Sequence, residues 1–371
     1  MESLLVIGLH TRPAVFSAKA LGYEVYSVDY FGSMDLKEKA DLSRSIIEQR
    51  PGASMGRISE NYSDAKLVEL AKDIDADKTI LTSTLEPNRK TLGTNPKRMK
   101  QIKDKWRQLQ KVERLGIHIP RSELARSRKE IVEISRNLKF PLIIKPVRGD
   151  GGKKVLLLHN IDEIPEIEKP HIVQEYVKGR PISVSTLSTK KESRAISSSL
   201  QILGSRFLNQ RGFAYCGSVV PYKCSDVAFR EAEEICRVFG VSGWNGVDFI
   251  ETNGRCIFME INSRFQGTYD CVELVYGLNL VDAHIKACEG ELMPASIAKG
   301  YSIRLTIYAG ERSIVCGDLA LLARDIPCRD VVVEKGEPIT TVVTWSPTRS
   351  AAILEAKEQA KRIYREFISN V

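Results

Sequence analysis

Apolar runs and helical patterns alternate along the first 95 residues of the chain. The expected elements are strands at residues 4–8, 25–29 and 79–84 and helices at residues 13–21 and 64–73. Gly22 ends the first helical pattern, and the second strand ends in an acidic residue. Because strands that alternate with helices usually form a parallel sheet, we predict a small parallel α/β domain over residues 1–95.

The loop after the first strand bears on cofactor binding. It reads GLHTRP at residues 8–13 and lacks the spaced glycines that let a backbone reach a dinucleotide pyrophosphate. A boundary at residues 94–96 is followed by a basic stretch, residues 97–114, in which Trp106 is the only aromatic residue. Nucleic-acid surfaces interleave aromatic and basic side chains, so this stretch indicates a solvated helix, and we expect no nucleic-acid partner.

A glycine-rich loop lies between two strands in the middle of the chain. The strand PLIIKPV at residues 141–147 leads into RGDGGKK at 148–154, and VLLLH at 155–159 follows. Glycines allow a backbone to approach phosphate oxygens closely, and lysines neutralise their charge. The loop is not a Walker A motif, because Lys153 is followed by a second lysine and then by a strand. A plain hairpin is the other interpretation.

The segment from residue 246 to residue 267 carries the strongest chemical signal. An Asn-Gly pair at residues 253–254 predicts a hairpin. Since side chains alternate along a strand, Glu260, Asn262 and Arg264 share one face. Carboxylate and amide oxygens suit Mg²⁺, and an arginine can hold a transferring phosphoryl group. The alternative is an exposed antiparallel pair with a polar face.

The register of this hairpin decides whether Asp248 joins that face. A two-residue turn pairs Asp248 with Met259, which places Asp248 on the opposite face. A three-residue turn or a bulge pairs Asp248 with Glu260. We predict the second register, in which the hairpin contains one extra residue. Gly254 or Arg255 would then adopt the left-handed conformation of a bulged turn.

Composition and charge describe an ordinary globular protein of two or three lobes. The 371 residues are 43% hydrophobic and 27% charged, and a net charge of +8 favours anionic ligands. The eight cysteines contain no CxxC spacing, so we interpret them mostly as small buried hydrophobes in a reducing compartment. The apolar run at the start is too short for a signal peptide or a membrane span, so we expect a cytoplasmic protein without a membrane partner.

Taken together and in this order, the motifs resemble the ATP-grasp superfamily, most closely its carboxylate-amine ligases and biotin carboxylase-like branch. The resemblance implies mixed α/β and α+β architecture in three parts. A preATP-grasp parallel α/β domain would occupy residues 1–95, and an ATP-grasp domain residues 96–295, with a mobile lid lobe at about 120–175. A C-terminal α+β lobe, which would complete the ATP-grasp module, would occupy residues 296–371 and end in a helix that starts near Thr348.

The resemblance also implies a set of site residues. The phosphates of ATP would be bound by Lys105 and Lys145 and covered by Gly149, Asp150, Gly151, Gly152 and Lys153. Adenine would be received by Gln174, Glu175 and Val177, largely through backbone groups. Two Mg²⁺ ions, with Mn²⁺ as a possible substitute, would be bound by Asp248, Glu260 and Asn262. Arg264 and Lys145 would be the catalytic residues. Pro181 stands where relatives often have an acid for the ribose.

The chemistry implied is activation of a carboxylate as an acyl phosphate, with release of ADP and attack by an amine. The partners would be small-molecule carboxylate and amine substrates, contacted by Glu86, Arg211 and Ser218, and the family often forms homodimers. One alternative is a carboxylase that activates bicarbonate, but the residues after Arg264 read FQGTY and lack the glutamate of biotin carboxylases. A nucleotide-binding module without turnover is another.

Overall fold

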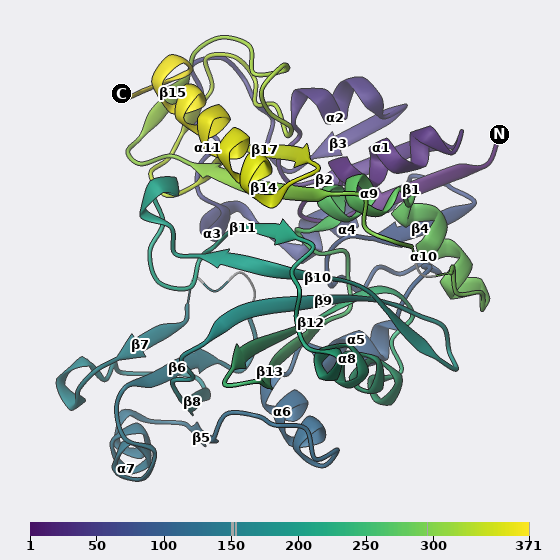
Figure 1. Cartoon of the computed structure of the whole chain (residues 1–371). Helices are drawn as coiled ribbons and strands as arrows, with labels where there is room; N and C mark the ends of the chain where they lie inside the picture. The colour runs from purple at the N-terminus through teal and green to yellow at the C-terminus, as the bar shows by residue number, and fades with distance from the viewer. Residues whose placement is uncertain (150–151, 153, 295, 371) are drawn as a thin grey trace.

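The computed structural model describes residues 1–149, 152, 154–294 and 296–370. The described strands form four sheets, which Figure 1 shows from the N-terminal parallel sheet at the upper right to a separate antiparallel sheet at the bottom. The mixture of one parallel sheet with antiparallel sheets confirms the predicted fold class.

The N-terminal sheet is parallel, as predicted, and has the order β3-β2-β1-β4. Its elements are β1 (Ser3–Ile7), α1 (Arg12–Ala20), β2 (Glu24–Asp29), α2 (Met34–Lys39), β3 (Leu42–Ser45), α3 (Ile58–Asn61), α4 (Asp64–Ala71) and β4 (Lys78–Leu81). Three of them, α2, β3 and α3, were not predicted. Strand β3 reads LSRS and lies at the sheet edge with no fully buried residue, so it lacks the apolar run that marks the other strands.

Side-chain alternation divides the core of this sheet between its two faces. Leu5 and Ile7 pack in a cluster with Leu67 of α4, whereas Leu4 and Val6 pack in a cluster that includes α1. The α1 side also joins apolar residues of the later helices α9 (Tyr269–Tyr276) and α10 (Leu280–Glu289). The N-terminal sheet is therefore attached to the rest of the chain through a shared core.

A small antiparallel sheet with the order β5-β8-β6-β7 forms the lower lobe in Figure 1. The elements of this region are α5 (Pro96–Ile102), α6 (Lys105–Glu113), β5 (Ser122–Ala125), α7 (Arg128–Leu138), β6 (Leu142–Pro146), β7 (Leu156–Leu158), a 3₁₀ turn (Ile161–Glu163) and β8 (His171–Glu175). Helix α7 packs on the sheet and gives the lobe its own core. The lobe therefore packs around its own core, and β6 and β8 are two of its strands.

The largest sheet has seven antiparallel strands in the order β13-β12-β9-β10-β11-β14-β17. They are β9 (Arg180–Ser188), β10 (Ser193–Leu203), β11 (Tyr215–Val220), β12 (Gly243–Thr252), β13 (Arg255–Asn262), β14 (Tyr301–Tyr308) and β17 (Pro338–Ser346). A 3₁₀ turn (Arg206–Leu208) and α8 (Asp226–Phe239) lie between them in sequence. The C-terminal strands β14 and β17 thus extend the same sheet as β9–β13.

The remaining C-terminal elements form a three-stranded sheet and a long helix. The sheet has the order β16 (Val332–Val333), β15 (Ser313–Val315) and β18 (Ile368–Asn370), and the helix is α11 (Arg349–Glu366). Helix α11 starts after Thr348, whose hydroxyl caps it, and buries Ala352, Ala356, Ala360 and Ile363. The domain boundaries at residues 95 and 295 stay a prediction.

The seven-stranded sheet has one apolar and one polar face, and the polar face positions the candidate site. Val247 and Phe249 lie on the apolar face and pack in a core with α8. On the other face, Asp248 pairs with Ser183, and Gln201 pairs with Ser218. Directly paired residues of antiparallel strands point to the same side, so this face is lined with polar groups.

Two expectations about the chain as a whole can be compared with the described residues. None of the helices in the described ranges combines the length and apolar character needed to cross a membrane. All eight cysteines are free thiols, and Cys216, Cys236, Cys256 and Cys271 are buried, whereas the other four are partly exposed. The interpretation as buried hydrophobes is therefore right for half of them.

Candidate active site

The hairpin of β12 and β13 pairs Asp248 with Glu260, as predicted, but the extra residue is not where we expected it. Asn253 and Gly254 form a two-residue turn with φ values of 47° and 72°, and Thr252 pairs with Arg255. The expectation of a bulged turn was therefore wrong. The register shifts instead at Met259, because Phe249 pairs with Phe258 and the next residue, Asp248, pairs with Glu260. A bulge beside the site turns the two carboxylates to one face.

Strand β13 is an edge strand, and side chains and backbone from outside the sheet hold it in place. The amide of Gln108 in α6 accepts a hydrogen bond from Ile261 N at 2.9 Å and donates one to Ile261 O at 3.3 Å. The backbone N–H of Phe258 donates to His118 O at 2.8 Å. These contacts flank Met259 and Glu260, so α6 and the segment after it fix the bulge. The first residue of α6 is Lys105, which the helix thereby brings to the site.

The side chains of Asp248, Glu260, Asn262, Arg264 and Lys105 form one cluster, which we call the carboxylate cluster. Asn262 Nδ2 donates to Asp248 Oδ2 at 3.1 Å and to Glu260 Oε1 at 3.3 Å. Lys105 forms an ion pair with Glu260, and Arg264 donates to Asn262 Oδ1 at 3.3 Å. The structure therefore brings together all three residues predicted for the metal site, with two of the predicted basic residues.

Burial sets the electrostatics of Asp248. Desolvation raises the pKa of its carboxyl group, and hydrogen bonds from Ser183 and the charges of Arg264 and Lys105 counteract that effect only in part. Gln201 of β10 adds a hydrogen bond from Nε2 to Asp248 Oδ1 at 3.2 Å. Additional positive charge beside Asp248 would stabilise its ionised form, which is the environment that a divalent cation provides.

The donor set of the carboxylate cluster fits a magnesium ion. Two carboxylates lie within hydrogen-bond distance of one side-chain amide, and these are the hard oxygen donors that Mg²⁺ binds. Within the described residues, no group of three or more His, Cys, Asp and Glu side chains is placed to bind a metal. A magnesium ion here would thus depend on Asp248, Glu260 and Asn262 together with oxygens from water or nucleotide, as is usual for this ion.

Lys145 of β6 lies buried near Lys105. Only 7% of its surface is exposed, and burial followed by the charge of Lys105 lowers its pKa to about 7. The backbone N–H of Lys105 donates to Val147 O at 3.0 Å, so the start of α6 is held against the end of β6. Lys105 is paired with Glu260, so the buried Lys145 is the ammonium group in this pair of lysines that a bound anion would stabilise most.

The glycine-rich loop approaches the segment that precedes β11. Gly149 and Gly152 have φ values of 150° and 71°. A Cβ atom on Gly152 would lie 2.2 Å from Phe213 O, so only glycine fits there. The predicted residues Asp150, Gly151 and Lys153 lie outside the described residues.

The predicted adenine hinge lies on β8 and just after it. Gln174 is fully buried, and its Nε2 donates to Ser122 Oγ at 2.8 Å. Gln174 pairs with Ile143, two residues before Lys145, so its side chain and that of Lys145 point to the same face of the small sheet. Glu175 forms an ion pair with Arg121 at 2.8 Å, and its backbone N–H donates to Arg121 O at 3.0 Å. Adenine contacts through the backbone of Glu175 and Val177 stay a prediction.

The three predicted substrate residues are not brought together. Ser218 is buried on the polar face of β11, and its hydroxyl is 2.8 Å from Tyr215 OH. Arg211 and Glu86 are exposed, the first before β11 and the second after β4. Within the described part of the chain, Arg211 and Glu86 form no hydrogen bond or ion pair with the carboxylate cluster, so their roles stay predictions.

Sequence reasoning missed two side chains that support the site. Gln201 contacts Asp248, and Gln108 holds β13. Gln201 belongs to an alternating strand, and its pairing with Ser218 would have revealed it once the strand order was known. Gln108 lies in a basic helix where no sequence pattern marks a buried amide.

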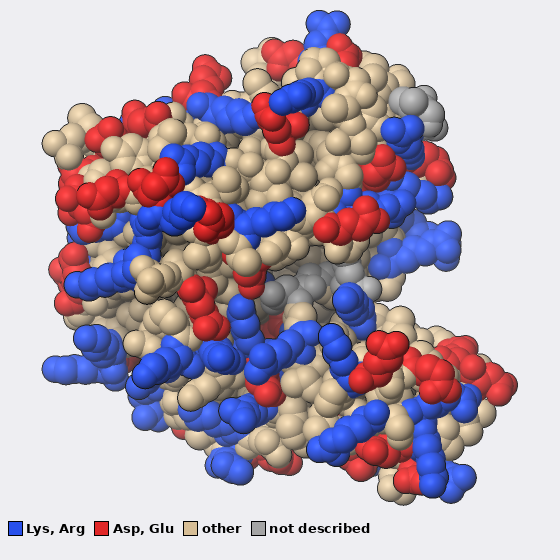
Figure 2. All heavy atoms as spheres, turned by 180° about the vertical axis from the view of Figure 1, so that it is seen from behind, with Lys and Arg blue, Asp and Glu red and all other residues tan. Residues whose placement is uncertain are grey.

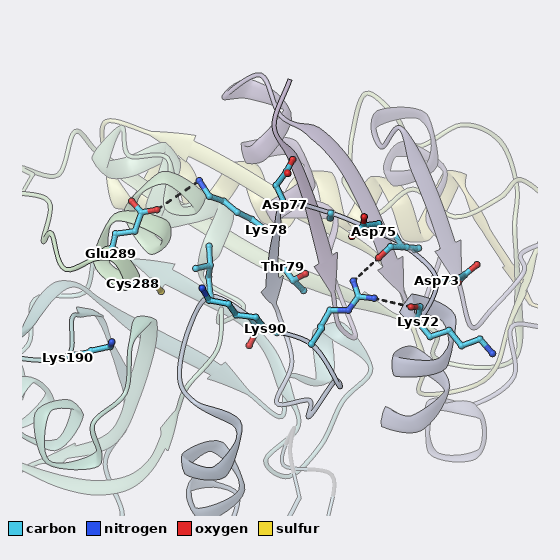
Figure 3. Close-up of a pocket in the computed structure, with 15 residues that line it drawn as sticks. Lys72, Asp73, Asp75, Asp77, Lys78, Thr79, Lys90, Lys190, Cys288 and Glu289 are labelled. Carbon is cyan, nitrogen blue, oxygen red and sulfur yellow. Dashed lines mark hydrogen bonds and ion pairs between the residues drawn. The ribbon is translucent and has the colours of Figure 1, made fainter.

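A cavity of about 730 Å³ lies away from the carboxylate cluster and contains none of the predicted site residues. It is lined by residues that surround β4 and by Lys190, Cys288 and Glu289 (Figure 3). Several charged side chains in it already have partners, because Lys78 pairs with Glu2 at 3.0 Å and Arg89 donates to the backbone of Ile74 at 2.8 Å. We do not assign the site there, since no candidate for phosphate or metal binding lines this cavity.

Basic side chains are prominent on the face turned away from the viewer of Figure 1. Figure 2 shows this face hollowed between its upper and lower parts, with Lys and Arg side chains frequent along the lower border of the hollow. Such a border favours approach of anionic ligands.

Comparison with known proteins agrees with this geometry. A family model described as an ATP-grasp domain matches residues 102–268, which contain Lys105, Lys145 and the carboxylate cluster. The uncharacterized protein MJ0776 of Methanocaldococcus jannaschii is 30% identical over 363 residues, which cover 93% of this chain and 89% of that protein. The similarity to it therefore extends over nearly the whole chain.

Two further similarities are more distant. The large chain of carbamoyl phosphate synthase from Clostridium beijerinckii is 25% identical over 214 residues, which cover 53% of this chain and 19% of that protein. This chain thus matches about a fifth of the length of that relative. The biotin carboxylase–β-γ-ATP complex from Campylobacter jejuni has a TM-score of 0.75 at 19% identity and covers 99% of this chain and 92% of that one. It shares the fold.

Proposed function

Since the chain belongs to the ATP-grasp superfamily, we propose that it is an ATP-dependent ligase that activates a carboxylate as an acyl phosphate and joins it to an amine. The observation that carries the proposal is the carboxylate cluster. Asp248 and Glu260 converge on Asn262, with Lys105 and Arg264 beside them. Clusters of this composition bind the metal and phosphate groups of a nucleotide and neutralise the charge that moves in phosphoryl transfer.

The basic residues have two tasks in this proposal. Lys105 and Lys145 bind phosphate oxygens, and Arg264 binds the transferring phosphoryl group. When bound, Mg²⁺ would neutralise phosphate charge and orient the phosphate chain. Glu260 would exchange its ion pair with Lys105 for the metal, which would leave the Lys105 ammonium to the phosphates.

The proposed reaction consists of two displacements. An oxygen of the substrate carboxylate attacks the γ-phosphorus, the bond to the β-phosphate oxygen breaks, and ADP leaves. The nitrogen lone pair of the amine then attacks the acyl carbon, phosphate leaves with the carbon–oxygen electron pair, and the nitrogen loses a proton. The chain's contribution is to align the reactants and to neutralise charge, which accounts for most of the acceleration in phosphoryl transfer.

The test is release of ADP and phosphate by the purified protein with ATP, Mg²⁺ and pools of amino acids, amines and small carboxylates. Release that depends on one pool, and is lost in Glu260→Gln, supports the proposal. Glu251→Gln is a matched control, because Glu251 lies in the same hairpin and accepts a hydrogen bond from Tyr222 OH at 2.7 Å. Release of AMP instead of ADP contradicts the acyl phosphate, and turnover that requires bicarbonate alone indicates a carboxylase.

A further inference from the structure

A second group of charged side chains lies apart from the carboxylate cluster. Its centre is Asp270 of α9, and we call the group the Asp270 cluster. Its other members are Arg12 of α1, Arg304 of β14, Arg324 and Asp325 between β15 and β16, Asp35 of α2, and His10 after β1. The members therefore come from the helices and loop beside the N-terminal sheet, from α9, from the seven-stranded sheet and from the segment between β15 and β16.

Asp270 accepts hydrogen bonds from three arginines. Arg12 NH1 and Arg304 NH1 each lie 3.1 Å from one of its carboxylate oxygens, and Arg324 NH1 also donates to it. These charges lower the pKa of Asp270 despite the opposing effect of its burial. Asp270 is thus ionised and holds the three guanidinium groups in one place.

Asp325 connects His10 with Arg304. His10 Nε2 lies 2.6 Å from Asp325 Oδ1, and Arg304 NH2 lies 3.6 Å from Asp325 Oδ2. Burial lowers the pKa of His10, but the charge and hydrogen bond of Asp325 oppose this effect, and the net shift raises it. Asp35 accepts from Arg12 Nε at 2.7 Å. With His10 protonated, three arginines and a histidine face Asp270, Asp325 and Asp35, and the buried Asp29 is a fourth acidic group near His10.

The cluster is buried at its base and open at its edge. Asp270 and Arg304 are only 6% and 7% exposed, whereas 27% of the His10 side chain and 29% of the Arg324 side chain are exposed. Arg304 Nε is buried without a hydrogen-bond partner in the described structure. A buried guanidinium nitrogen without a partner is costly in a purely structural ion-pair network, and an oxygen of a bound anion would satisfy it.

The polar face of the seven-stranded sheet connects the two clusters. Arg304 pairs with Ser218 across β14 and β11, and Ser218 pairs with Gln201 across β11 and β10. Gln201 in turn donates to Asp248. Strands β12 and β14 are four strand spacings apart, or about 19 Å between backbones. Long side chains shorten this separation, so one elongated small molecule can reach both clusters.

We propose that the Asp270 cluster is a second anion-binding subsite, which binds a carboxylate or phosphate group at the end of a substrate remote from its reacting carboxylate. The inference rests on the proposed function and narrows it to substrates that carry two anionic groups. Arg324 and His10 contact the anion at the exposed edge of the cluster, and Arg304 contacts it from the buried base. Asp270 is a positioning residue that keeps the arginines converged.

The test monitors the NMR signals of His10 in the absence of nucleotide. The ring signals of His10 are identified by their loss in His10→Gln and are followed by NMR while inorganic phosphate or glutarate is added at constant ionic strength. A site of millimolar affinity fills at about 10 mM anion. We expect the His10 signals to shift in a saturable way with one or both anions. Phosphate alone would indicate a phosphorylated substrate, and glutarate a dicarboxylate.

Variants separate anion binding from structure. Arg324→Gln should weaken the response of His10 about tenfold, as loss of a charge-assisted contact predicts, and Arg324→Lys should retain most of it. Arg329→Gln is the control, because Arg329 is nearby in sequence and exposed. If Arg324→Gln does not fold, His10→Gln is used in its place. The rise in melting temperature that the anion causes should be smaller in His10→Gln than in the unaltered protein.

A His10 signal that does not respond to either anion, or an equal response in Arg324→Gln, overturns the proposal and leaves the cluster as a structural ion-pair network. The assay contains no ATP, so its outcome is independent of ligase activity. Absence of ADP release together with anion binding at His10 would contradict the proposed function and leave the subsite in place.

Discussion

Replacement of Lys145 by methionine should stabilise the protein while removing its ability to bind ATP. Burial, with the charge of Lys105, lowers the pKa of Lys145 from 10.5 to about 7. At about 1.4 kcal/mol per pKa unit, this difference corresponds to roughly 5 kcal/mol of unfavourable free energy when the lysine is fully protonated. Methionine has a similar length and no charge, so Lys145→Met removes that cost.

The sign of the pH dependence follows from proton binding. Between pH 7 and pH 10.5 the unfolded chain keeps the proton of Lys145 and the folded protein has lost it. The unfolded state therefore binds more protons, and the contribution of Lys145 to the free energy of unfolding rises with pH across this window. Below pH 7 both states are protonated, and the full cost applies.

Urea denaturation at pH 6, 7, 8 and 9 measures this effect, with each pH chosen to bracket the pKa of about 7. We expect Lys145→Met to be more stable than the unaltered protein by about 3 to 5 kcal/mol at pH 6 and by less at pH 9. Lys154→Met, at an exposed position, should show no such difference. A Lys145→Met protein that is less stable at pH 6, or a difference that does not change with pH, refutes the assignment of Lys145 as a buried, uncompensated ammonium group.

Three further predictions concern the carboxylate cluster, the glycine-rich loop and the contact that holds β13. Glu260→Gln should fold normally and lose activity, measured as ADP release, by about a hundredfold or more, because it removes a contact to the metal and to Lys105. Retained activity would contradict the role of Glu260. Gly152→Ala should weaken ATP binding in a titration, because a Cβ would meet Phe213 O at 2.2 Å, and an unchanged affinity would show that this approach does not matter. Gln108→Ala should lower the free energy of unfolding by about 2 kcal/mol, because it leaves Ile261 N–H and C=O without their side-chain partner; a loss below the error of the measurement would contradict that support.

The register of the hairpin shows how far the sequence could lead. Side-chain alternation placed Glu260 and Asn262 on one face. The requirement that Asp248 join that face correctly predicted one extra residue in the hairpin. The position of the extra residue was not readable, because a turn and a bulge satisfy the same count. The bulge at Met259 is fixed by contacts from His118 and Gln108, which lie far away in sequence.

The Asp270 cluster was beyond sequence reasoning for a related reason. His10 and Arg12 lie in one segment, and Arg304 and Asp325 lie in two others; each has an ordinary local environment in the sequence. Only the packing of α1 and α9 and the pairing of β14 bring them together. Local patterns predict elements and faces, whereas the meeting of distant charged groups depends on topology.

The measurement that tests the central claim most directly uses a carboxylate substrate labelled with heavy oxygen, taken from the pool that supports turnover. If the carboxylate cluster catalyses formation of an acyl phosphate, one labelled oxygen passes from the carboxylate to the released phosphate, and the nucleotide product is ADP. Labelled AMP would show that the carboxylate attacks the α-phosphorus, and unlabelled phosphate would show that water does. Either result would contradict the ligase mechanism proposed for Asp248, Glu260, Asn262 and Arg264.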